Sequence, residues 1–499
     1  MPGANYAMEL RLDMARKILH LMFIVILCWV GLLSAAEDKP LLIRGGHYFD
    51  VHNGTMVDNR GILIDSGRIN SVAVPVLEVS SDDYRIVDLQ DDEYLLPGFV
   101  DLHAHYRIAA FGSDEHLAGL VEEYGYWTDE FKYNAVIYLA NGVTSTFSAG
   151  VYAPNFEKRA SELVSSGKWI GPRMWRSGPY FGNARPGWDS RITKEQIYSE
   201  IDHWAFQGIS GIKVKEITPD HLGYVLSRAH SHGLTVTGHL DSGYNNTVSS
   251  DLAIEMGIDR VEHILGGYAL DPSKEAYVVW NQLKTTSEDF KKTVRQFISN
   301  SVYFDATMAA PIYFLQTELK EGFEYWVDER TFLTPYAQRL LPDQQSRNKN
   351  ELMDELYLAM RRTTKAFYDA GGGHLITLGT DTTSHGDFLG GFSAHREMHT
   401  MVLAGIPAES VLKIATINGA RALRKGELIG SIDVGKLADL VVVQGNPLHD
   451  ITNTRNTRLI IKSGKIYKSE ELFAFAEGKI GPHDSDEVAD WFKYQELLD

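Results

Sequence analysis

The sequence predicts an α/β protein: a (β/α)8 TIM-like barrel with a small β-sandwich domain formed from both chain ends. Three observations support this fold class. From residue 41, short apolar runs alternate with turn signals such as Asn53-Gly54. From residue 97, apolar strand candidates are separated by helical stretches of roughly ten to twenty residues. Near Gly430 the pattern of short strands returns.

The barrel prediction depends on eight apolar runs in the middle of the chain. Strands that alternate with helices are typical of β/α units sharing a parallel sheet, and eight such units close into a barrel. The strand candidates are Phe99–His103, Val143–Phe147, Arg173–Ser177, Gly211–Lys215, Thr235–His239, Arg260–His263, Val302–Thr307 and Leu375–Thr380.

Both ends of the chain contain short β-like runs, and we expect them to pair into one domain beside the barrel. The N-terminal runs Leu41–Arg44, Gly61–Asp65 and Ile69–Val76 indicate a small antiparallel unit. The C-terminal runs are Gly430–Ile432, Asp439–Val443 and Leu459–Tyr467. The predicted organisation is a signal peptide over 1–36, β-sandwich parts over 37–96 and 426–469, the barrel over 97–425 and an acidic tail over 470–499.

The N-terminus contains the only cysteine of the chain, Cys28, inside the apolar run Ile18–Leu33. Two basic residues precede this run and Ser34-Ala35-Ala36 follows it, which is the pattern of a secretory signal peptide. Cleavage after Ala36 would leave a chain without disulfides or thiolate ligands. We therefore expect a periplasmic or secreted protein. An uncleaved membrane anchor is the alternative.

Charge composition excludes one class of partner. The 499 residues include 66 acidic and 48 basic side chains, for a net charge of −18. Nucleic-acid binding needs a basic surface, so we expect a small-molecule substrate and no nucleic acid. A homo-oligomer remains open.

The strongest local signal for chemistry is the pair His103 and His105, which closes the first barrel strand. Residues two apart on a strand point to one face, and the C-terminal ends of barrel strands form the functional face. Two imidazoles placed there suit a metal ion. A second pair, His230 and His232, lies in a helix that ends at Gly233. Positions i and i+2 of a helix do not face each other, so this pair is expected at the surface.

Further polar residues stand at the ends of later strand candidates. Lys213 and Lys215 belong to the fourth strand, His239 and His263 close the fifth and sixth, and Asp381 follows the eighth. Each position alone has an ordinary structural explanation. Together with His103 and His105 they predict a metal site at one face of the barrel.

The residues that would recognise a substrate stay open at this stage. Tyr106, Arg107, Tyr180, Arg185 and Tyr244 follow barrel strands and are explained equally well by packing or solvent contact. The long connection Ala310–Gly373 carries aromatic residues that either shape a substrate pocket or pack between helices. These aromatics are Tyr313, Phe314, Phe323, Tyr325, Trp326, Phe332 and Tyr336.

The sequence resembles the amidohydrolase superfamily of metal-dependent hydrolases over roughly residues 40 to 468, and within it the imidazolonepropionase-like and prolidase-like members. Seven motifs carry the resemblance, and together they are specific for the superfamily. They are Pro97–His105, Asn141–Thr146, Gly171–Arg173, Glu262-His263, Gly379–Asp381, Ala415–Arg421 and Gly430–Val442. Gly238–Ser242 departs from the alanine-rich setting usual around this histidine.

The resemblance implies two divalent metal ions, for which zinc is the first expectation and manganese or cobalt the alternatives. His103 and His105 would bind the more buried ion with Asp381 as a further ligand, while His239 and His263 would bind the second ion. A carboxylated lysine would bridge the ions. Lys213 fits the family pattern for it better than Lys215, and without carboxylation the site holds one metal.

The implied activity is hydrolysis of an amide or peptide-like C–N bond by water that the metals activate. Asp381 would be both ligand and general acid–base, and a dipeptide or an N-acyl amino acid is the expected substrate. The same site acting on a cyclic imide, a lactone or a phosphoester is the alternative. A non-catalytic binding barrel is the competing reading from a different class.

Overall fold

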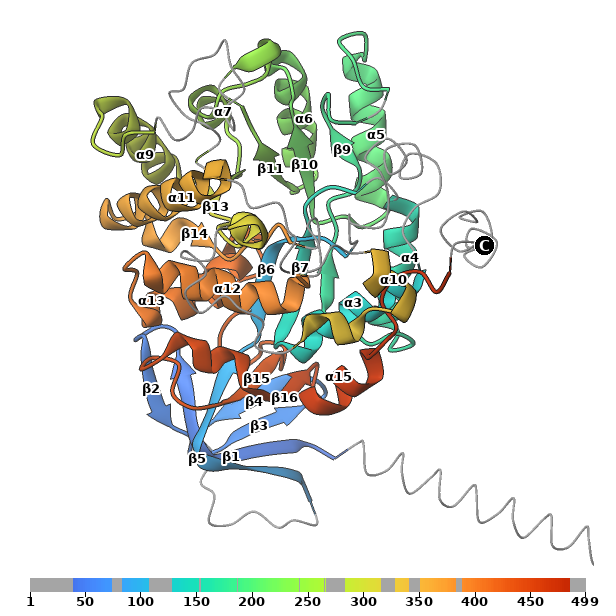
Figure 1. Cartoon of the computed structure of the whole chain (residues 1–499), viewed down its shortest axis with the longest axis vertical. Helices are drawn as coiled ribbons and strands as arrows, with labels where there is room; N and C mark the ends of the chain where they lie inside the picture. The colour runs from blue at the N-terminus through green and yellow to red at the C-terminus, as the bar shows by residue number, and fades with distance from the viewer. Residues whose placement is uncertain are drawn as a thin grey trace, which may run out of the picture.

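The structure is a computed structural model that describes residues 39–73, 83–106, 128–151, 154–185, 187–241, 243–263, 265, 283–315, 328–340, 351–382 and 388–484 (Figure 1). The predicted signal peptide with Cys28, the site candidate Arg107, the side chain of Tyr244 and three loop aromatics, Phe323, Tyr325 and Trp326, lie outside the described residues. So does the end of the predicted tail, 485–499. None of the helices in the described ranges is sufficiently long and apolar to cross a membrane.

The two chain ends meet in one sheet, as the sequence predicted. Its strand order is β17-β16-β15-β5-β1-β3-β4, with β2 paired to β1. Figure 1 shows these strands gathered at one end of the molecule, with α15 (Ser469–Ala476) beside β16 and most of the other helices farther from this end. The strands are β1 (Leu41–Asp50), β2 (Thr55–Asp58), β3 (Ile62–Asp65), β4 (Arg68–Val72), β5 (Arg85–Pro97), β15 (Leu440–Gln444), β16 (Thr457–Lys462) and β17 (Lys465–Lys468).

The predicted N-terminal unit is antiparallel, since β1 pairs with β3 and β3 with β4 in antiparallel register. β1 and β5 run parallel, with Leu42 opposite Ile86, because three short strands return the chain before β5 begins. The β3–β4 turn lies against the β16–β17 turn, where a Cβ on Gly67 would sit 2.8 Å from the Ser463 carbonyl oxygen. This close approach, at a φ of +74° for Gly67, requires glycine.

The barrel strands form two parallel sheets. A three-stranded sheet has the order β6-β7-β8, and a six-stranded sheet has the order β14-β13-β12-β11-β10-β9, all parallel. The strands are β6 (Phe99–Ala104), β7 (Val143–Ser148), β8 (Arg173–Trp175), β9 (Tyr180–Phe181), β10 (Gly211–Lys215), β11 (Thr235–His239), β12 (Arg260–Glu262), β13 (Tyr303–Asp305) and β14 (Ile376–Thr377).

Two junctions join these sheets into one cyclic order. β8 lies inside the third predicted strand and pairs with β7, while β9 follows just beyond that strand and pairs with β10. On the other side, the Leu102 amide donates to the Leu378 carbonyl (2.8 Å) and the Asp381 amide to the His103 carbonyl (2.9 Å). The eight predicted strands therefore follow one another in a ring, which is consistent with the predicted (β/α)8 barrel.

Helices separate the barrel strands and surround them (Figure 1). Ser or Thr N-caps begin several of them: Thr193 forms a capping box with Gln196, and Ser287 accepts from the Phe290 amide. The main helices are α3 (Thr128–Ala140), α4 (Pro154–Ser165), α5 (Lys194–Phe206), α6 (Pro219–Ser231), α7 (Ser250–Met256), α9 (Glu288–Asn300), α11 (Glu351–Asp369), α12 (Gly390–Leu403), α13 (Ala408–Lys413), α14 (Gly419–Ala422) and α15 (Ser469–Ala476).

A buried carboxylate connects the barrel to the sheet formed by the two chain ends. Asp439, just before β15, accepts from the Arg173 guanidinium at the start of β8 (3.2 Å) and from the Ser463 amide (2.8 Å). Its carbonyl accepts from the Gly98 amide at the junction of β5 and β6 (2.8 Å). These contacts fix the first barrel strand, and therefore the His103 pair, relative to the sheet.

Candidate metal centre

The predicted site residues lie at the C-terminal ends of barrel strands, where strand pairing places them next to one another. His103 is the last residue but one of β6 and His105 follows that strand, while Lys213 lies two residues before the end of β10. His239 ends β11 in register with Lys215. His263 directly follows β12, and Asp381 lies in the segment after β14. The parallel direction of all these strands puts the side chains on one face.

Asp381 is the point at which three histidines meet. Its Oδ1 atom lies 3.0 Å from His105 Nε2 and 3.3 Å from His103 Nε2. Its Oδ2 atom lies 3.9 Å from His263 Nδ1. A carboxylate and imidazole nitrogens this close together can all act as ligands to one divalent cation.

His239 and His263 form the second half of the cluster. His263 Nε2 and His239 Nδ1 lie 2.8 Å apart. The Thr307 hydroxyl donates to the Ala306 carbonyl (2.9 Å), so it accepts from His263 Nδ1–H at 2.8 Å. A neutral His263 ring then carries its lone pair on Nε2, which faces His239.

Lys213 is buried beneath the histidines and contacts a carboxylate that the sequence analysis did not assign. Its Nζ atom donates to Glu262 Oε2, and both side chains are almost fully inaccessible to solvent. The same Oε2 atom lies 3.6 Å from His103 Nδ1 and 4.0 Å from His263 Nε2. Lys215 is partly exposed, one layer nearer the barrel rim. Only Lys213 of the two lysines is therefore in contact with Glu262 among the described contacts.

Burial and neighbouring charges set the protonation of the cluster. Burial lowers the pKa of His263 to about 3 and holds the pKa of His239 well below its ordinary value. Burial also lowers the pKa of His105. For Asp381, burial acts to raise the pKa, but the charge of His103 and hydrogen bonds outweigh it and hold the pKa well below the ordinary value. At neutral pH these groups are neutral imidazoles and a carboxylate, the forms that bind metal.

A layer of buried polar residues supports the cluster from within the barrel. Asp101 Oδ1 accepts from the His103 amide (3.0 Å) and the Thr380 amide (3.1 Å), which ties β6 to the segment that carries Asp381. Arg260 Nε lies 3.1 Å from Asp305 Oδ2 and also donates to the Thr237 hydroxyl (3.0 Å). These residues orient the candidate ligands.

Backbone conformation at the cluster is unusual for residues other than glycine. His263, Thr307 and Asp381 have φ values of +65°, +49° and +47°. Glu216, directly after β10, has φ of +52°. Non-glycine residues rarely adopt this left-handed region, and such strain gathers at functional sites. The positions coincide with the ends of four barrel strands.

The residues present fit a divalent cation. Three groups have one ligand atom from each member within 4.8 Å of one another: His103 with His263 and Asp381, His239 with Glu262 and His263, and His103 with Glu262 and Asp305. His103 Nδ1 is buried and has no hydrogen-bond partner in the described part of the chain. Nitrogen and carboxylate donors without thiolate suit zinc, manganese and cobalt.

Sequence reasoning found most of this cluster but missed Glu262, Asp305 and Asp101. Glu262 stands next to His263 in the sequence, and Asp101 stands two residues before His103, so position on a shared strand was the available signal. Asp305 ends β13, where no motif pointed to it. Its place opposite Glu262 depends on strand register.

The other sequence candidates lie elsewhere or have structural partners. His230 and His232 are exposed, as predicted, and contact Asp259 (2.8 Å) and Asp202 (2.6 Å). Arg185 pairs with Glu200 at 2.7 Å. Tyr106 and Tyr180 are buried: the Tyr106 hydroxyl forms a hydrogen bond with the Thr146 hydroxyl at 2.6 Å, and the Tyr180 ring lies against Gly150.

Of the aromatic residues in the long connection, Tyr313 and Phe314 pack against each other. Phe332 stacks on Phe392, while the Tyr336 ring lies under Arg339.

Comparison with known proteins gives one family match over most of the chain. The model of the amidohydrolase family matches residues 94–467. The 5-methylthioadenosine/S-adenosylhomocysteine deaminase of Syntrophobacter fumaroxidans (strain DSM 10017 / MPOB) is 40% identical over 80 residues, which are 15% of this chain and 18% of the deaminase. The match therefore spans less than a fifth of that relative.

Solved structures share the fold over nearly the whole described chain. A Xaa-Pro dipeptidase with bound methionine in the active site aligns with a TM-score of 0.63 and 21% identity, covering 86% of this chain and 100% of the dipeptidase. Phenylurea hydrolase B aligns with a TM-score of 0.63 and 17% identity, covering 89% of this chain and 100% of the hydrolase. Likeness at this identity establishes the fold.

Proposed function

The chain belongs to the amidohydrolase family, and on this basis we propose that it is a binuclear metal hydrolase of amide or peptide-like C–N bonds. The observation that carries the proposal is the contact of Asp381 with His103 and His105 beside the His239–His263 pair. These residues come from four strands far apart in the sequence. The family is metal-dependent, and the donor set suits that requirement.

In this proposal two groups of residues hold the ions. His103, His105 and Asp381 take the more buried ion, and His239 and His263 take the second. When bound, two divalent ions, for which we expect zinc, polarise the scissile carbonyl and lower the pKa of water. Thr307 keeps His263 Nε2 directed at the second position. Asp101 keeps β6 and the Asp381 segment in register.

Lys213 is proposed as the bridge after reaction with carbon dioxide. Burial lowers the pKa of Lys213 and so favours the neutral amine. In the modification, Nζ attacks the carbon of carbon dioxide, an N–C bond forms, and the amine releases one proton to solvent. Lys215 is the alternative, and it does not contact Glu262 among the described residues.

Asp381 is proposed to move the proton in the reaction. Its pKa is held well below the ordinary value, so it is a carboxylate able to accept the proton of the attacking water. It then gives that proton to the nitrogen that leaves. One carboxylate therefore acts as general base and general acid.

The proposed substrate is a dipeptide or an N-acyl amino acid. Support comes from the fold that the chain shares with a Xaa-Pro dipeptidase. A second candidate is hydrolytic deamination, favoured by the 40% identity over 80 residues to the deaminase of Syntrophobacter fumaroxidans. Both reactions break a C–N bond with water and differ in whether ammonia is released.

A panel of dipeptides, N-acyl amino acids and 5′-deoxyadenosine, assayed with zinc-loaded protein, tests this proposal. We expect amine release from at least one dipeptide or N-acyl amino acid, and a loss of about a hundred- to ten-thousandfold in Asp381→Asn. Ammonia release from 5′-deoxyadenosine alone would select deamination. Full activity of Asp381→Asn would contradict the assignment of this residue.

The bridge is tested separately with paired lysine variants. Protein equilibrated with 13C-labelled carbon dioxide should give a carbamate carbon signal that Lys213→Met removes and the control Lys215→Met retains. The opposite pattern would assign Lys215, and the absence of a signal in all proteins would contradict the carboxylated bridge.

We also propose that residues 1–36 direct export to the periplasm or the exterior. The supporting observation is the order of basic residues, apolar run and Ser34-Ala35-Ala36. N-terminal sequencing of protein from the producing cell should begin at Glu37. A chain that retains residues 1–36 in the membrane fraction would instead identify an anchor.

A further inference from the structure

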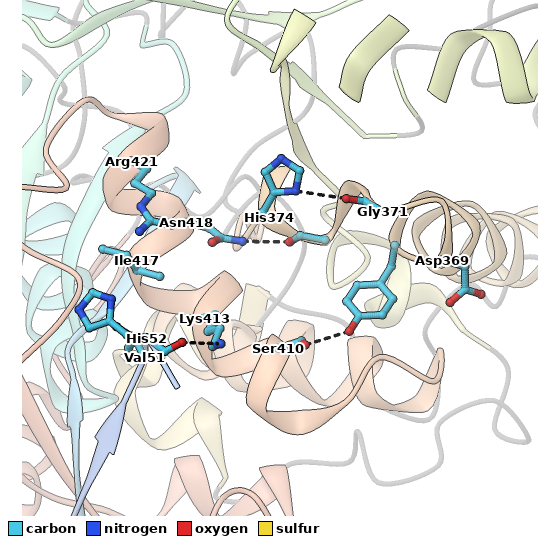
Figure 2. A pocket seen from close by; sticks show the side chains of 12 residues that line it. Val51, His52, Asp369, Gly371, His374, Ser410, Lys413, Ile417, Asn418 and Arg421 are labelled. Atoms are coloured by element: carbon cyan, nitrogen blue, oxygen red, sulfur yellow. Dashed lines mark hydrogen bonds between the residues drawn. The ribbon is translucent and has the colours of Figure 1, made fainter. Parts of the chain in front are cut away.

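A hollow on the opposite side of the barrel collects positively charged and imidazole side chains. It has a volume of about 620 Å³, within the range of small-molecule sites. Gly371, Gly373 and His374, which line it, precede β14, whereas Asp381 follows β14. The hollow is therefore at the amino-terminal end of the barrel strands, away from the candidate metal centre. Figure 2 shows its lining side chains.

Four basic side chains face this hollow from separate segments of both domains. His52 comes from the turn after β1, His374 from the turn before β14, Lys413 from the end of α13 and Arg421 from α14 (Figure 2). Pockets at domain junctions are common ligand sites. The hollow therefore brings together His52 and residues that are more than three hundred positions later in the chain.

Nearby carboxylates neutralise only part of the positive charge at this hollow, since His52 Nε2 lies 3.0 Å from Asp433 Oδ2. Asp369, the one acidic lining residue, is held at 2.6 Å by Lys365 through both of its oxygens. No described carboxylate forms an ion pair with Lys413 or Arg421. In a chain with a net charge of −18, two uncompensated cations beside one hollow are unusual.

Local geometry holds one of these cations in place. Lys413 Nζ donates to the His52 carbonyl at 3.5 Å, which leaves its charge intact. Gly54 permits this approach, because a Cβ there would lie 3.1 Å from Nζ. The helix between Lys413 and Arg421 widens into a π-helical turn over Ile414–Asn418. Such turns occur often at functional sites.

The remaining wall gives the hollow an apolar side. Val51, Ile417 and the ring of Tyr368 line it together with the basic groups. A bare inorganic anion would fill only a small part of about 620 Å³. We propose that this hollow binds a small organic oxyanion, a carboxylate or phosphate group on an apolar or aromatic body, with the oxyanion at Lys413 and Arg421.

Binding of phenylphosphonate, measured by calorimetry with zinc-loaded protein, tests the proposal. The double variant Lys413→Met/Arg421→Met should bind one equivalent less than wild type, or bind the second equivalent at least tenfold more weakly. The matched control Arg60→Met/Lys168→Met removes two exposed cations outside the hollow and should bind as wild type does. The metal centre is common to all three proteins, so any phosphonate bound there cancels in the comparison.

Two further measurements locate the ligand and its chemistry. A crystal soaked in 4-bromophenylphosphonate should show an anomalous bromine peak in the hollow, and benzyl alcohol should bind at least tenfold more weakly than phenylphosphonate. Equal stoichiometry in all three proteins, a bromine peak at the metal centre alone, or equal binding of benzyl alcohol would overturn the proposal. None of these measurements records hydrolysis, so their outcome is independent of the proposed function.

Discussion

Thr307 determines which nitrogen of His263 is available as a ligand. Its hydroxyl donates to the Ala306 carbonyl and accepts from His263 Nδ1–H. Thr307→Val removes the acceptor with little change in volume, so the ring can turn or change tautomer. Partners of metal-bound histidines are typically worth ten- to hundredfold in metal affinity. We expect a loss of that size for the second zinc ion, measured by competition with a chelating dye.

The conservative variant separates a positioning role from a packing role. Thr307→Ser keeps the hydroxyl and should keep zinc affinity close to wild type, although it loses a methyl group. If Thr307→Ser weakened zinc binding as much as Thr307→Val, the hydroxyl would not be the group that positions His263.

Glu397 makes stability depend on pH at a position outside the cluster. This carboxyl is fully buried in α12 and accepts from the Ala309 amide at 2.5 Å, in the loop after Thr307. Burial raises its pKa to about 8. Between the ordinary value of 4.5 and about 8 the folded protein holds a proton that the unfolded chain releases. The free energy of unfolding therefore falls as pH rises through this window.

Glu397→Gln should remove this dependence, because the amide keeps an acceptor and never ionises. We expect the variant to gain stability relative to wild type between pH 5 and pH 9, by an amount on the order of a few kcal/mol. Urea unfolding at both pH values measures it. The exposed control Glu427→Gln should follow wild type, and parallel curves for Glu397→Gln and wild type would refute the prediction.

At the scale of elements, the junction between β5 and β6 leaves no room for a side chain at Gly98. A Cβ at this position would lie 2.1 Å from Thr144 Oγ1 on β7, while the Gly98 amide donates to the Asp439 carbonyl. Gly98→Ala should therefore lower the free energy of unfolding by about 1–3 kcal/mol. It should also displace β6, which carries His103.

A glycine in a helix provides the matched control for this substitution. Gly223 lies inside α6, and a Cβ there would meet only the Met256 methyl at an ordinary 3.5 Å. Gly223→Ala should be neutral or stabilise by about 0.4–1 kcal/mol. Thermal unfolding of both variants checks the pair. Equal melting temperatures would show that the β5–β6 junction relaxes at no cost.

Two strands in the middle of the barrel were located best from the sequence. Gly211–Lys215 and Thr235–His239 have the predicted bounds. The third strand is shorter than predicted, and a further short strand, β9, follows it after Gly178, which turns the chain at a φ of +69°, and Pro179, which has no amide to donate. The eighth is shorter than predicted, since the Leu378 carbonyl accepts from β6 instead.

The sequence identified site residues that a local pattern marks, and it missed those whose role depends on contacts between distant strands. His103, His239, His263 and Asp381 could be found because each stands at the end of its own strand. The importance of Glu262 could not, since its contact with Lys213 depends on two strands separated by β11. Contacts across the barrel interior have no signature in a single stretch of sequence.

At the scale of the whole molecule, the sheet formed by the chain ends helps to position the barrel strands that carry the candidate centre. Both ends pair in one sheet, and Asp439 attaches this sheet to β8 and to the start of β6. Because the ligands come from distant strands, metal should bind the folded chain far better than the unfolded chain. Chelation should therefore lower the melting temperature, and added zinc should restore it.

Metal stoichiometry tests the central claim most directly. Elemental analysis of protein dialysed against zinc should give two ions per chain for wild type and one for His103→Asn or His239→Asn. The surface control His230→Asn should keep two. One ion or fewer in wild type, or an unchanged count in both His103→Asn and His239→Asn, would contradict a binuclear centre built from these strand ends.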